Sequence, residues 1–133
     1  MTTGWPTGSY AGFTTTVCPQ WVDYNGHLTD WAYAVVCSMA NEAMLDELGL
    51  GAAYRERTGC AMYTVQANLR YVAEVGPDAI VHATSSYQAD GKRLRVRTTL
   101  LVDGVEVLSA EHLYLHVDTT AGRTTPFSKP TVQ

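Results

Sequence analysis

Trp21–Gly51 reads WVDYNGHLTDWAYAVVCSMANEAMLDELGLG, and this stretch decides the fold. Its polar, glycine-containing beginning predicts a loop. Apolar residues then recur at helical spacing to about Leu48, which predicts one long helix that Thr29 or Asp30 can cap. Gly49 and Gly51 supply the stop. The predicted apolar face of the helix consists of Val36, Met39, Ala40, Ala43, Met44 and Leu48.

Most of the remaining chain has the two-residue period that is typical of strands. We expect a first strand over residues 13–18, a short extra turn of helix over 52–59, and four strands over 60–72, 77–89, 92–102 and 105–117. Asp90-Gly91 and Asp103-Gly104 predict tight hairpins. One helix cannot cover two sheet faces, so the pattern predicts an α+β fold whose antiparallel sheet wraps around the helix or pairs with another copy.

Length, charge and cysteine content limit the number of domains, the classes of partner and the compartment that we expect. The 133 residues fit a single domain over 1–133, with a core at about 13–117 and a loosely ordered tail over 118–133. A net charge of −4 argues against nucleic acid as a partner. Cys18, Cys37 and Cys60 lie far apart, which is typical of small hydrophobic residues in a reducing compartment. Neither a signal peptide nor a membrane-spanning run is found, so we expect a cytoplasmic protein.

The segment DYNGHLTD places a carboxylate, Asp23, just before the predicted helix. A helix N-terminus has unpaired backbone N–H groups and a partial positive charge, which suit a developing oxyanion. Asp23 can activate water or attack directly, while the N–H groups of Asp30 or Trp31 stabilise the oxygen. Asn25 and His27 can orient the water, tune Asp23 or contact a leaving group. A purely structural alternative stays open, in which Asp23 and Asn25 form an Asx-turn and His27 only packs.

Aromatic side chains gather around this segment in the sequence. They are Trp21, Tyr24, Trp31, Tyr33 and Tyr63. Aromatic faces bind quaternary ammonium groups, so these rings can form a cage for a cationic ligand. They can equally fill a core or a subunit interface.

Arg93, Arg95 and Arg97 alternate with apolar residues on one predicted strand. Arginine binds phosphate bidentately, so this stripe can contact the phosphates of a ligand, or it can be a solvated outer face. His112 and His116 share a strand face but lie roughly 13 Å apart, too far to chelate one metal ion together. We therefore expect no metal site.

These residues carry a family resemblance. WVDYNGHLTDWAY resembles the signature of hotdog-fold acyl-CoA thioesterases of the 4-hydroxybenzoyl-CoA thioesterase type. The resemblance implies a five-stranded antiparallel sheet wrapped around one central helix. It also implies a homodimer or homotetramer with active sites at the subunit interface. Coenzyme A enters only as part of the substrate, with no separate cofactor.

Residue roles follow from the same resemblance. Asp23 takes the place of the catalytic nucleophile or general base, and a backbone N–H near Asp30 binds the thioester oxygen. The second subunit contributes residues around Tyr63 to Asn68, including Gln66. A second group of hotdog thioesterases has its carboxylate on the helix, which makes Glu42 a backup. The arginine stripe becomes a weak candidate for contacting the CoA phosphates.

A narrower resemblance is to betainyl-CoA thioesterases, found alone or fused to L-carnitine dehydrogenase. It is carried by WVDYNGHLTD, YTVQANLRYVAE, DGKRLRV and HLYLHVD. Gln66 stands where those relatives often have Glu, and the lost carboxylate weakens the case for a cationic substrate.

Two alternatives stay open beside it. One is a hotdog enoyl-CoA hydratase, although Gly26 stands where its loop has Pro and His27 falls one residue early. The other is a non-catalytic acyl-CoA-binding module.

Overall fold

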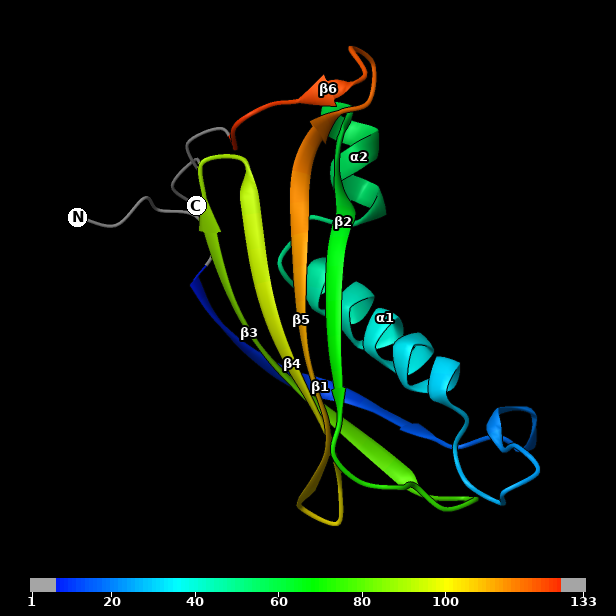
Figure 1. The fold of residues 1–133 in the computed structure, drawn as a ribbon. Coiled ribbons are helices and arrows are strands. Elements are labelled where there is room, and N and C mark those ends of the chain that lie inside the picture. Colours follow the sequence, from blue (N-terminus) through cyan, green and yellow to red (C-terminus); the bar gives the residue numbers. More distant parts are fainter. Residues whose placement is uncertain (1–6, 128–133) are drawn as a thin grey trace.

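The structure, a computed structural model, describes residues 7–127. Its elements in chain order are β1 (Thr7–Thr16), the 3-10 turn η1 (Pro19–Trp21), α1 (Asp30–Glu47), α2 (Ala52–Thr58), β2 (Cys60–Tyr71), β3 (Ile80–Asp90), β4 (Arg93–Val102), β5 (Val105–Asp118) and β6 (Arg123–Thr124). The strands form one antiparallel sheet in the order β1-β3-β4-β5-β2, with β6 paired to β5. The sheet curves around α1 (Figure 1). The predicted α+β arrangement, a sheet wrapped around one long helix, is confirmed.

The caps and the second hairpin turn lie where the sequence predicts them, whereas the first turn is Gly91-Lys92, one residue after the predicted Asp90-Gly91. Thr29 is the N-cap of α1 and Leu48 its C-cap, and Gly49 adopts a φ of 74°, which favours glycine. Both predicted hairpins form with two-residue turns; in the second, Val102 pairs with Val105 across Asp103-Gly104. The first strand differs from the expectation. It begins at Thr7 because β1 pairs with β3 from Thr7 onward, through small residues that carry little strand signal of their own.

The segment after Asp118 is more ordered than the sequence predicts. Up to Phe127 it folds back on the sheet: β6 pairs with β5, and the Phe127 N–H donates to the Gly91 carbonyl at 3.0 Å. The buried His116 holds this segment, because its Nδ1 lies 2.8 Å from the Thr125 carbonyl and its ring stacks on Phe127. The expectation of a loose tail is therefore wrong for residues 119–127. The expectation for residues 128–133 lies outside the described residues.

One face of α1 is buried against the concave side of the sheet. The buried residues are Ala32, Tyr33, Val36, Cys37, Ala40, Asn41, Met44 and Leu45. The predicted face is corrected at Met39, which is 37% exposed because it lies to one side of this stripe. On β4 the inner residues Leu94, Val96, Thr98 and Leu100 are all buried. The helix and sheet therefore share one core.

Two polar side chains enter that core. Asn41 is 0% exposed, and its Oδ1 accepts a hydrogen bond from the Thr98 hydroxyl at 2.8 Å. Within the described residues, Asn41 Nδ2 and His112 Nδ1 are buried without a partner. Burial lowers the pKa of His112, so its ring is held in the neutral form.

Cys18, Cys37 and Cys60 are free, and burial raises the pKa of Cys37 to about 12, which leaves it unreactive. Neither described helix has the length and apolar character needed to cross a membrane.

The Asn41–Thr98 hydrogen bond yields a stability prediction. Replacing Thr98 with Val keeps the side-chain shape but leaves Asn41 Oδ1 buried without a donor. We expect the free energy of unfolding to fall by about 1–3 kcal/mol. Thr99→Val, on the outer side of the same strand, should change it by less than about 0.5 kcal/mol. Urea unfolding of both variants measures the difference, and equal effects would show that the bond contributes nothing.

Candidate active site

The loop before α1 is a tight, hydrogen-bonded turn. The Asp23 N–H donates to the His27 carbonyl at 3.0 Å, and the Gly26 N–H donates to the Asp23 carbonyl at 2.9 Å. Val22 and Leu28 form a β-bridge at its base. Gly26 has a φ of 80°, which only glycine adopts readily. The backbone thus fixes where the Asp23 side chain begins.

The Asp23 carboxylate takes part in this turn. Its Oδ1 accepts a hydrogen bond from the Asn25 N–H at 2.8 Å, which is the Asx-turn of the structural alternative. The side chain is half-buried, and within residues 7–127 its second oxygen has no hydrogen-bond partner. The structural and the catalytic interpretations are therefore compatible, since the turn orients one oxygen and leaves the other available.

The two predicted oxyanion donors are not equivalent. The Trp31 N–H donates to the carboxylate of Asp30 at 2.7 Å, so this donor is already occupied. No acceptor for the Asp30 N–H is found within the described part of the chain. Thr29 caps α1 without a side-chain hydrogen bond, which leaves the first turn open to an incoming oxygen. Of the two, the Asp30 N–H is the better placed to receive one.

The segment that follows β2 holds this loop in place. The Leu28 N–H donates to the Val75 carbonyl at 2.8 Å, and the Tyr71 hydroxyl donates to the Asp30 carbonyl at 3.0 Å. His27 Nε2 lies 3.5 Å from Glu74 Oε1. Burial, aided by the Asp30 carboxylate, raises the pKa of Tyr71 and keeps its hydroxyl a donor. Tyr71 and Glu74 lie in the segment YTVQANLRYVAE, but the sequence analysis gave them no role at the loop because they follow it by more than 40 residues.

The predicted aromatic residues do not form one cage within the single chain. Tyr33 is buried; its hydroxyl bonds to the Ala73 carbonyl, and its ring packs edge-on against Tyr71 at 5.0 Å. Trp21 packs against the core. Tyr24 and Trp31, at 98% and 54% exposure, stay available beside Asp23. Tyr33 therefore follows the core-filling alternative.

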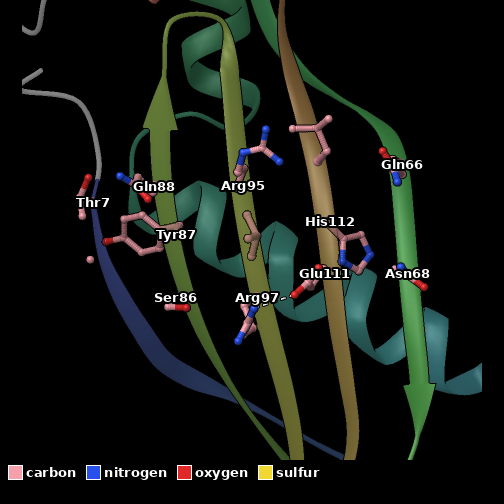
Figure 2. A pocket seen from close by; sticks show the side chains of 13 residues that line it. Thr7, Gln66, Asn68, Ser86, Tyr87, Gln88, Arg95, Arg97, Glu111 and His112 are labelled. Carbon is pink, nitrogen blue, oxygen red and sulfur yellow. Dashed lines mark hydrogen bonds and ion pairs between the residues drawn. The ribbon is translucent and has the colours of Figure 1, made fainter.

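The remaining strand and helix candidates lie away from Asp23 in the same chain. Tyr63 is roughly 26 Å along β2 from Tyr71, whose end of the strand meets the loop. Gln66 and Asn68 point to the side of the sheet opposite α1 (Figure 2). Glu42 is exposed on α1, roughly 18 Å along the helix from Asp30. Any role of these residues at Asp23 would need a second chain, so their roles stay predictions.

The arginine stripe alternates as predicted. Arg93, Arg95 and Arg97 are exposed while Leu94 and Val96 are buried. Arg95 and Arg97 line the same outer-face hollow as Gln66 and Asn68, whereas Arg93 does not.

The histidines offer no chelating pair. The two ring nitrogens of His116 face the Tyr54 hydroxyl, at 2.7 Å, and the Thr125 carbonyl. Among residues 7–127 no group of three or more His, Cys, Asp or Glu side chains is placed to hold a metal ion.

Comparison with known proteins places this geometry in a family. Residues 17–133 match the model of the thioesterase-like superfamily. The chain is 35% identical over 118 residues to a betainyl-CoA thioesterase of Pseudomonas aeruginosa, covering 86% of this chain and 74% of that protein. It is 44% identical over 106 residues, 78% of its length, to an L-carnitine dehydrogenase/betainyl-CoA thioesterase of Agrobacterium fabrum, of which it spans only 22%.

A solved structure supports the fold. A Staphylococcus aureus protein determined in complex with CoA superposes with a TM-score of 0.82 at 20% identity, covering 96% of this chain and 89% of that one. At 20% identity this similarity supports the architecture alone. That architecture is the predicted hotdog fold. The family match and the identity to the Pseudomonas protein decide the assignment: the chain belongs to the thioesterase-like superfamily.

Proposed function

We propose that the chain is an acyl-CoA thioesterase that hydrolyses a small acyl-CoA to the free acid and CoA, with betainyl-CoA as its substrate. One observation carries the proposal. A carboxylate fixed by the Asx-turn at Asp23 lies just before a helix whose first N–H, that of Asp30, has no acceptor among the described residues. In a chain of this family, that pair supplies an activating base and an oxyanion donor.

The reaction follows from these two groups. Asp23 accepts a proton from water as the water oxygen bonds to the thioester carbon, or its own oxygen attacks that carbon to give an anhydride that water then cleaves. In both routes the carbonyl oxygen becomes an anion, which the Asp30 N–H stabilises at the positive end of α1. Collapse of the tetrahedral intermediate breaks the C–S bond, and the CoA thiolate leaves and takes up a proton.

Local charge supports a cationic acyl group. The carboxylates of Asp23, Asp30 and Glu74 belong to the loop, the helix start and the segment that holds them. The exposed rings of Tyr24 and Trp31 lie on the same part of the chain. Carboxylates and aromatic faces both attract a quaternary ammonium group. Two relatives named as betainyl-CoA thioesterases point to the same chemistry.

A dimer completes the proposal. β2 is the last strand of the sheet, so its outer edge is unpaired in the single chain. This edge carries exposed Tyr63 and Val65, which are unusual on an unprotected edge strand. Pairing of β2 with a second copy would cover them and carry Tyr63, Gln66 and Asn68 of one chain toward Asp23 of the other.

The dimer is tested by Val65→Lys, which places a charge on the β2 edge. We expect the wild type to sediment as a dimer or a higher oligomer and the variant to dissociate at a concentration at least tenfold higher. Because the sites would need both chains, turnover should fall as the variant dissociates. A wild-type chain that sediments as a monomer and is fully active would contradict this part of the proposal.

The role of Asp23 is tested by Asp23→Asn, since Asn can still accept the Asn25 N–H and preserve the turn. We expect kcat to fall by roughly 10²–10⁴-fold as the base or nucleophile is lost. Asp103→Asn, in an exposed hairpin turn, is the matched control and should leave kcat unchanged. Free-thiol release from an acyl-CoA panel measures both. Undiminished turnover by Asp23→Asn would remove Asp23 from the mechanism.

The same panel separates the other activities. Loss of the enoyl absorbance of crotonyl-CoA without thiol release would indicate a hydratase. Binding of CoA esters without turnover of any of them would indicate a binding module.

The acyl group is tested with betainyl-CoA and its neutral isostere 3,3-dimethylbutanoyl-CoA, in which carbon replaces the charged nitrogen. We expect a kcat/KM for betainyl-CoA that is higher by at least tenfold. Trp31→Leu should lower kcat/KM about 2- to 30-fold for betainyl-CoA and leave the isostere nearly unaffected, because only the cation interacts with the ring face. Equal turnover of both esters by the wild type would contradict cation recognition.

A further inference from the structure

The outer face of the sheet, opposite α1, carries a polar hollow of about 550 Å³. This volume lies in the usual range for small-molecule sites. Figure 2 shows that Arg95 and Arg97 on β4 point into it, between Ser86 and Gln88 of β3 on one side and Glu111 of β5 on the other. Gln66 and Asn68 of β2 close the far side. None of these side chains takes part in the Asp23 turn.

The charges in the hollow do not cancel. Arg97 donates to Glu111 at 2.6 Å, which neutralises one guanidinium. Within the described residues, Arg95 has neither an ion pair nor a hydrogen bond. A smaller hollow next to the first is lined by Arg70 together with Arg97 and Glu111. Three arginines therefore face one carboxylate across the two hollows.

Neutral hydrogen-bonding groups surround this excess positive charge. The side chains of Ser86, Gln88, Gln66 and Asn68 can each donate to an oxygen. A guanidinium fork with adjacent amide donors is the usual arrangement for phosphate oxygens. A second copy of the same face would instead bring arginine against arginine, which is repulsive.

We propose that this hollow binds a phosphate-bearing ligand through Arg95 and Arg97. Arg95 supplies the uncompensated charge. Arg97, already oriented by Glu111, supplies a second fork. Two sources have this chemistry: a free nucleotide, and the nucleotide end of CoA. The second source rests on the proposed thioesterase function, and the first does not.

The binding test uses the full chain and two probes, adenosine 3′,5′-bisphosphate and pyrophosphate, in isothermal titration calorimetry. We expect saturable binding that weakens as salt is raised, and affinity at least tenfold lower in Arg95→Gln. Arg55→Gln on the exposed side of α2 removes the same charge elsewhere and should bind as the wild type does. Failure of both probes to bind, or equal affinity in the two variants, would overturn the proposal.

A kinetic comparison identifies the source of the ligand. Hydrolysis is measured with an acyl-CoA and with the matching acyl-pantetheine, which lacks the nucleotide. If the substrate's nucleotide occupies the hollow, Arg95→Gln raises KM at least tenfold for the CoA ester alone. If a free nucleotide occupies it, the variant loses probe binding while both KM values stay unchanged. The calorimetric result requires no turnover, so its failure is distinguishable from failure of the thioesterase proposal.

Discussion

One helix has to cover a sheet that is wider than itself, and the rest of the molecule depends on this constraint. An α-helix with its side chains is about 10–12 Å across, whereas strands lie about 4.8 Å apart, so α1 can cover only part of a five-strand face. α1 packs chiefly on β1, β3 and β4. Tyr54 of α2 and Phe127 of the returning C-terminal segment cover the region around His116. What stays uncovered is the edge strand β2, with its exposed Tyr63, Val65 and Tyr71.

That uncovered strand also determines where the site can form. The chain leaves β2 at Tyr71, and the next few residues meet the loop before α1 through Val75 and Glu74. The hydroxyl of Tyr71 donates to the carbonyl of the first helical residue, so the end of β2 and the start of α1 are joined directly. Hydrogen bonds thus link the Asp23 loop and the start of α1 to the end of a potential partner edge. Their proximity follows from the topology and not from the motif alone.

Local physics explains which parts of this arrangement the sequence can predict. Helix bounds and hairpin turns depend on caps and glycines next to them in the chain, so Gly49 and Asp103-Gly104 indicate them directly. The Asx-turn at Asp23 is equally local. Contacts between distant segments have no such signal. The hydrogen bond of Tyr71 to Asp30, the docking of Phe127, and the meeting of Gln66 on β2 with Arg95 on β4 all depend on which strands become neighbours.

The two sides of the sheet differ in charge, and this difference bears on the kind of substrate. Carboxylates of Asp23, Asp30 and Glu74 gather at the N-terminal end of α1, and arginines gather on the outer face. A cationic acyl-CoA is complementary to this arrangement, because its acyl end is positively charged and its nucleotide end is negatively charged. The two regions lie on opposite sides of the sheet, however, so one substrate reaching both has to pass around an edge. If β2 pairs with a second copy, Gln66 and Asn68, which line the hollow, approach the Asp23 of that copy. In the proposed dimer, the Asp23 site of one chain and the hollow of the other therefore lie on the two sides of the shared β2 edge, where one substrate could span both.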